Sequence, residues 1–185
     1  MELNGNWLKG DWLQTYTGKQ FWPLDPQQDA IDIFDIAHAL SHQCRYGGHC
    51  RKFYSVAEHV VHVSLAVPPQ DALWGLLHDG AKAYLVDVPR PVKKYLINYD
   101  KIEANLMAAI QRKFGLQGDM PQSVKDADNA ILFTERAALL SKPPADWDFE
   151  GVKPLDCPIH GWGPEQAEYM FLERFVDLDM RRRAA

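Results

Sequence analysis

The sequence predicts an all-α protein, a helical bundle that forms a single domain over residues 1–185 behind a small extended or hairpin segment. Apolar residues recur at helical spacing in several stretches after residue 30, and capping residues, proline or glycine bound most of them. The first 30 residues instead carry glycines, prolines and scattered aromatics without a helical period. With 185 residues, of which 46% are hydrophobic and 24% charged, the chain can bury one sizeable core.

Composition and charge argue against several classes of partner. A net charge of −5 gives no basic surplus, so we expect no nucleic-acid partner. No apolar run approaches the roughly 18–20 residues of a membrane span, and the N-terminus lacks the pattern of a signal peptide. The three cysteines form no Cys-x-x-Cys pair, which favours reduced thiols. We therefore expect a cytoplasmic protein without a membrane partner.

The N-terminal segment leads into the first predicted helix. Residues 15–19 end in Gly18-Lys19, which is typical of a small hairpin or an extended flap. A helix of about ten residues should then begin at Asp32, because apolar residues follow at helical spacing. His38 and His42 lie on this helix, and surface or capping roles are their simplest interpretation.

A glycine-containing loop at residues 44–54 precedes the second helix. Gly47 and Gly48 let the backbone turn and approach a ligand closely. Arg45 and His49 flank them and are residue types that bind phosphate, although a surface loop with incidental charge would look the same. Ser55 and the glutamate three residues later then form the pattern of a capping box that opens a helix. This helix carries His59.

A third predicted helix begins near Gln70, after two prolines, and runs into the pair His78-Asp79. Imidazole nitrogen and carboxylate oxygen are the ligands that proteins use for zinc, manganese, iron or cobalt. The short proline corner makes this helix a neighbour of the one that carries His59. Alone, the pair is a weak signal, since a histidine at a helix end is more often a polar cap.

Three further helices are expected after the break at residues 88–91. One spans about 99–114 and stops at Gly115, one begins at Pro121, and the last begins at Pro164. Asp128 lies four residues after Val124 and three before Ile131, on the apolar face of its helix. A carboxylate there is costly unless it is paired or bound to a metal. Residues 142–163 are predicted to form a long ordered loop that could include a short strand.

These residues carry a resemblance to a known family. One histidine, a His-Asp pair and a distant aspartate are the pattern of the HD-domain metal phosphohydrolases, matched here by His59, His78, Asp79 and Asp128. Residues 16–19, 35–41, 45–49, 54–59, 83–93 and 125–128 are similar to bacterial and prophage members of the nucleotide-hydrolysing branch. The resemblance spans about residues 15–178, and it implies that the helices carrying the four residues face one another.

The resemblance also implies roles. His59, His78, Asp79 and Asp128 would bind a divalent transition metal (manganese, cobalt, iron or zinc). Arg45, with Tyr46 and His49 on the same loop, would face the substrate, and Asp87 would lie beside the catalytic water. The expected substrate is a deoxynucleotide, hydrolysed as a monophosphate or with release of triphosphate; the sequence leaves both open. We also expect a homo-oligomer.

Two positions depart from the family pattern. Lys82 replaces the glutamate usual four residues after His78, and Val86 replaces a frequent glycine. Because that glutamate is thought to serve as a general acid or base, Lys82 and Asp87 become the candidate catalytic residues. Burial and a nearby dication should lower the pKa of Lys82. A nucleotide-binding or regulatory protein with weakened catalysis is therefore the alternative, and a signalling-nucleotide hydrolase of the same fold is a weaker third.

Overall fold

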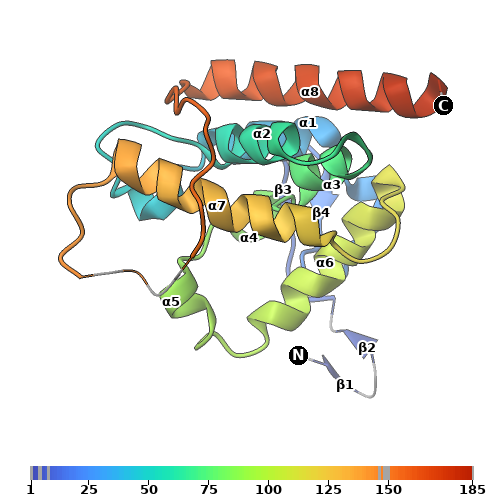
Figure 1. Cartoon of the computed structure of the whole chain (residues 1–185). Coiled ribbons are helices and arrows are strands. Elements are labelled where there is room, and N and C mark those ends of the chain that lie inside the picture. Colours follow the sequence, from blue (N-terminus) through green and yellow to red (C-terminus); the bar gives the residue numbers. More distant parts are fainter. Residues whose placement is uncertain (1, 4–5, 8, 146, 148–150, 185) are drawn as a thin grey trace.

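The computed structural model describes residues 2–3, 6–7, 9–145, 147 and 151–184, and its fold is predominantly helical, as predicted (Figure 1). The helices are α1 (Ile33–His42), α2 (Val56–Ala66), α3 (Ala72–Leu77), α4 (Lys82–Leu85), α5 (Arg90–Lys93), α6 (Tyr99–Phe114), α7 (Gln122–Leu139) and α8 (Pro164–Ala184). Short 3₁₀ turns form η1 (Gln28–Ala30), η2 (Arg45–Gly48) and η3 (Pro69–Asp71). None of the helices in these ranges has the length and apolar character needed to cross a membrane.

Helix α2 is the centre of the bundle, and its residues 56–64 are all buried. It contacts α1, α3, α7 and α8, and α8 runs along one side of the molecule over α1 and α2 (Figure 1). The close approach of α2 and α3 depends on Gly75, because a Cβ atom there would lie 2.9 Å from the Cα of Ser64. The core therefore holds the middle of α2, where His59 lies, in a fixed position.

The N-terminal segment contains two small hairpins. Strands β1 (Glu2–Leu3) and β2 (Asn6–Trp7) pair antiparallel, as do β3 (Leu13–Gln14) and β4 (Gln20–Phe21). The second hairpin confirms the turn predicted at residues 15–19. The backbone amide and the hydroxyl of Thr17 donate to the carboxylate of Asp35, at 2.7 and 3.0 Å, which attaches this turn to α1.

One local prediction was wrong, and one possibility that the sequence left open is not realised. The helix expected from Gln70 to Asp79 is broken: η3 precedes α3, α3 ends at Leu77, and turns lead to α4. No strand occurs among the described residues of the 142–163 loop.

The predicted capping box is only half formed. The hydroxyl of Ser55 accepts from the amide of Glu58 at 3.0 Å, as expected of an N-cap. The carboxylate of Glu58 instead accepts from the backbone amides of His160, Gly161 and Trp162, at 2.7–2.8 Å. Although burial alone would raise the pKa of Glu58, the adjacent His62 and these amides keep it below its usual value. Glu58 thus attaches the long loop to α2 rather than closing the helix end.

Val86 ends α4 in a conformation that favours glycine, with φ +62° and ψ 165°. A β-branched residue in this region stores about 1–3 kcal/mol of strain. The side chain is 60% exposed, so little packing opposes its removal.

We predict that Val86→Gly raises the free energy of unfolding by about 1–2 kcal/mol, since part of the released strain is offset by the greater freedom of glycine in the unfolded chain. Urea and thermal unfolding would measure the change. Val92→Gly is the matched control, because Val92 is also exposed but lies within α5 and should lose stability. A loss of stability in both variants would contradict the assignment of strain to Val86.

Candidate metal centre

Four side chains from three parts of the bundle converge at one point. His59 comes from the middle of α2, His78 and Asp79 from the turn after α3, and Asp128 from α7. Asp128 Oδ1 lies 3.2 Å from His59 Nε2 and 3.9 Å from His78 Nε2. Asp79 Oδ2 is 3.7 Å from each of the same two nitrogens. The residues that the sequence selected as metal ligands therefore lie together.

Hydrogen bonds on the far side of both rings set their tautomers. His59 Nδ1 is 2.6 Å from Glu135 Oε1, and His78 Nδ1 is 2.8 Å from the carbonyl oxygen of Gly75. Since both partners are acceptors, each Nδ1–H donates and each neutral ring keeps its lone pair on Nε2. Both Nε2 atoms are buried and lack a hydrogen-bond partner among the described residues. Such orphaned acceptors beside carboxylates fit a divalent cation.

The pKa of His59 reflects the same environment. Burial and the guanidinium of Arg45 disfavour the imidazolium, but Glu135 and Asp128 outweigh them and raise the pKa of His59. A site that attracts a proton to Nε2 for this reason would also attract a metal ion. The donor set of imidazoles and carboxylates suits manganese, iron, cobalt or zinc.

Glu135 is the principal site residue that sequence reasoning missed. It is fully buried on α7 and accepts from His59, from Tyr54 Oη at 2.9 Å, from Tyr46 Oη at 2.5 Å and from Arg45 Nε at 3.2 Å. Burial alone would raise the pKa of Glu135, but Arg45 and His59 lower it to about 2. Glu135 lies two helical turns after Asp128. The pattern that marked Asp128, a carboxylate on the apolar face of its helix, therefore applies to Glu135 as well.

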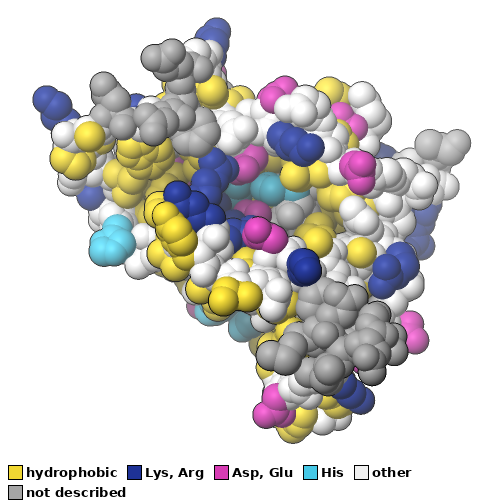
Figure 2. Space-filling view, turned by 90° about the horizontal axis from the view of Figure 1, so that it is seen from below, with side chains coloured by type: hydrophobic (Ala, Val, Ile, Leu, Met, Phe, Trp, Pro, Cys, Tyr) yellow, Lys and Arg dark blue, Asp and Glu magenta, His cyan; other side chains and the backbone are white. Residues whose placement is uncertain are grey.

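A cavity of about 670 Å³ opens at the two aspartates of this cluster, Asp79 and Asp128. Figure 2 shows acidic and basic side chains gathered around a hollow with histidine within it. Its lining includes the candidate ligands Asp79 and Asp128 and the candidate catalytic pair Lys82 and Asp87. Three further basic side chains line it, namely Arg45, Arg90 and Lys93. The other lining residues are Tyr46, Gly47, Val88, Pro89, Pro91, Leu132 and Trp147. His49 is exposed on the 44–54 loop and is not part of this lining.

Of the three loop residues expected to face the substrate, Arg45 and Tyr46 lie at the cavity, unlike His49. Tyr46 and Arg45 line the cavity, but Arg45 is only 6% exposed. Its Nε and Nη2 face Glu135, both at 3.2 Å, while Nη1 lies 3.7 Å from Asp79 Oδ2. Arg45 therefore supports the fold as well as presenting positive charge at the floor of the cavity. Gly47 and Gly48, with φ of +60° and +83°, provide the turn expected between Arg45 and His49.

Lys82 joins the two acids on either side of it. Its Nζ is 2.8 Å from Asp79 Oδ2 and 2.7 Å from Asp87 Oδ1. From the protein groups alone the pKa of Lys82 is raised, because burial disfavours the ammonium but the two carboxylates outweigh it. The expected fall also depended on a bound dication and stays a prediction for the metal-bound site. Gln43 holds both ends of α4, donating to the carbonyl of Lys82 and accepting from the amide of Asp87, each at 3.0 Å.

Fold and site together define an all-α protein with a largely buried two-histidine, two-aspartate cluster, of which His59 is fully buried and Asp128 is 25% exposed, at a charged cavity. No protein-family model matches the chain. The uncharacterized protein YfdR of Escherichia coli is 39% identical over 175 residues, which cover 94% of this chain and 98% of YfdR. The uncharacterized protein RCAP_rcc00048 of Rhodobacter capsulatus is 32% identical over 164 residues, covering 80% of this chain and 84% of that protein. The chain belongs to the family of these two proteins.

We predict that Glu135→Gln weakens divalent metal binding by about 10–100-fold, because His59 loses the carboxylate that orients its ring and increases its basicity. Unfolding free energy should also fall, by about 3 kcal/mol or more, since Arg45 keeps a buried charge without its partner. Metal titration and urea unfolding would measure the two effects. Glu173→Gln, an exposed site on α8, is the control and should change neither. Unaltered metal affinity in Glu135→Gln would limit Glu135 to a structural role.

Proposed function

We propose that the chain is a metal-dependent phosphohydrolase of the HD-domain type that acts on nucleotide phosphates, with deoxynucleotides as the leading substrates. The observation that carries the proposal is the convergence of two orphaned Nε2 atoms with Asp79 and Asp128 beneath a cavity with basic walls. Substrate class rests on the resemblance of the sequence to the nucleotide-hydrolysing branch. A cytoplasmic homo-oligomer is part of the same proposal.

His59, His78, Asp79 and Asp128 would hold the metal. A divalent ion bound there would lower the pKa of a coordinated water and neutralise charge that develops on phosphate. Asp87 faces the same cavity, and Gln43 fixes its backbone, so its carboxylate is the group best placed to accept a proton. Lys82 holds that carboxylate in an ion pair, which must open before Asp87 can act as a base.

The remaining walls suit a nucleotide. Arg45, Lys82, Arg90 and Lys93 bring positive charge around the cavity, as phosphate binding requires. Leu132 and Trp147 add apolar surface on which a base could rest, and a cavity of about 670 Å³ lies within the usual range for small-molecule sites. These features accommodate either a monophosphate or a triphosphate, so a 5′-nucleotidase and a triphosphohydrolase are both compatible.

A second candidate function is nucleotide binding with weakened catalysis. It is favoured by the ion pairs of Lys82, whose single ammonium is shared by Asp79 and Asp87 at 2.7–2.8 Å. Such a protein would use the cavity for recognition or regulation. Tight nucleotide binding without phosphate release would identify it.

We predict phosphate release from a deoxynucleoside monophosphate or triphosphate when manganese, cobalt, zinc and magnesium are screened separately. His78→Ala and Asp128→Ala should each lose the metal, measured by elemental analysis, and lose activity with it. Asp126→Ala is the matched control, since Asp126 lies on α7 two residues earlier but is exposed. Full metal occupancy in both His78→Ala and Asp128→Ala would refute the ligand assignment.

We predict that Lys82→Glu increases turnover about 10²–10⁴-fold, the usual contribution of a positioned acid or base. The substitution restores the family's glutamate and frees Asp79 and Asp87 from the ammonium, so metal affinity should rise as well. Lys82→Ala separates these effects, because it removes the cation without adding an acid. Side-by-side assays with one metal decide the matter: slower turnover in Lys82→Glu would mean that Lys82 is itself the working group.

A further inference from the structure

A second cluster of metal-ligand side chains lies where α1 meets α8, with no member in the lining of the charged cavity. His38 and His42 belong to α1, and Glu168 belongs to α8. We propose that these three residues form a separate binding site for a divalent transition metal of the zinc type, and that metal binding there fastens α8 to the bundle.

The spacing and distances suit one shared ion. His38 and His42 are four residues apart, so they share a face of α1, and their ring centroids are 4.1 Å apart. Glu168 Oε2 lies 3.0 Å from His38 Nδ1, and ligand atoms from the three residues all lie within 4.8 Å of one another. Donor atoms around an ion with bonds of about 2.1 Å are separated by about 3.0–3.5 Å. Small rotations of the side chains are enough to close the site.

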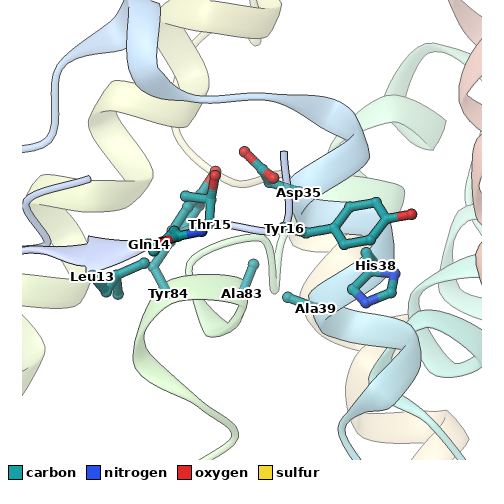
Figure 3. A pocket seen from close by; sticks show the side chains of 9 residues that line it. All are labelled: Leu13, Gln14, Thr15, Tyr16, Asp35, His38, Ala39, Ala83 and Tyr84. Atoms are coloured by element: carbon teal, nitrogen blue, oxygen red, sulfur yellow. The ribbon is translucent and has the colours of Figure 1, made fainter. Parts of the chain in front are cut away.

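The two histidines are already held in place. His42 Nδ1 is 2.8 Å from the carbonyl oxygen of His38, so it donates there and keeps its lone pair on Nε2. The ring of Tyr16 lies flat against that of His38, with centroids 3.6 Å apart and planes 6° apart (Figure 3). A binding site whose ligands are ordered beforehand loses less entropy when the ion binds.

Metal binding would change the contribution of the His38–Glu168 contact to the stability of the fold. Without metal, His38 and Glu168 form a partly exposed hydrogen bond, with side chains 29% and 20% exposed, and such exposed contacts contribute little. On binding, the His38 Nδ1 proton would leave to solvent and the ion would link three residues directly. Three protein ligands leave a position for water, and the exposed His42 places the ion within reach of solvent.

The test is a zinc titration of the full chain in competition with a chromophoric chelator. We expect wild-type protein to bind two ions. His42→Ala should lose one site or weaken it by about tenfold or more, as should Glu168→Gln, which keeps the side chain's size and lies on the other helix. His78→Ala should lose only the ion in the charged cavity. His49→Ala, an exposed histidine outside both clusters, is the control and should still bind two ions.

Thermal unfolding gives a second readout that does not depend on activity. Zinc should raise the Tm of His78→Ala, in which only the α1–α8 site remains, and should not raise that of the His42→Ala/His78→Ala double variant. Wild-type stoichiometry and affinity in both His42→Ala and Glu168→Gln would overturn the proposal. The test separates this site from the proposed function. If His78→Ala binds zinc as wild type does while His42→Ala binds none, the cavity site fails and the α1–α8 site stands.

Discussion

The rest of the site depends on the hydrogen bonds and ion pairs of one buried carboxylate, that of Glu135. An ionised group without solvent contact is tolerated only when hydrogen bonds and opposite charge surround it. Here two tyrosine hydroxyls, the guanidinium of Arg45 and the ring of His59 fill that role. One carboxylate thereby joins α7 to α2 and to the loop before it, fixes the tautomer of His59 and holds Arg45 at the floor of the cavity.

Much of the scaffold could be predicted because its signals are local. Helices α1, α6 and α7 begin and end close to where periodicity, Asp32, Gly115 and Pro121 place their ends. The same reasoning marked Asp128 as a carboxylate on an apolar face, and applied two turns further along α7 it would also have marked Glu135. That the four ligand candidates meet came only from the family resemblance, because spacing along the sequence does not say which helices pack together.

Two features could not be predicted from local patterns alone. Glu58 has the spacing of a capping glutamate, yet three amides about a hundred residues away bind it more strongly than one amide at its own helix end. From the protein groups alone, the pKa of Lys82 is raised rather than lowered, because the break after Leu77 and the turn at Val86 bring two carboxylates to its ammonium. In the first case a distant contact outweighed a sound local rule, and in the second the charges of two nearby carboxylates outweighed the effect of burial.

Charge balance explains how these parts fit one function. The centre gathers the carboxylates of Asp79, Asp87, Asp128 and Glu135, against which stand two largely buried cations, Arg45 and Lys82. The two remaining negative charges are only partly offset by Arg90, an exposed side chain 3.4 Å from Asp128 Oδ2, and they lie close to the two lone pairs on the Nε2 atoms. In a region that excludes most solvent such an excess is costly, and a single divalent cation would neutralise it. Under the proposed function, Lys82 stands where the resembled family carries a glutamate, leaves enough negative charge to hold a metal, and occupies the acids that catalysis would use.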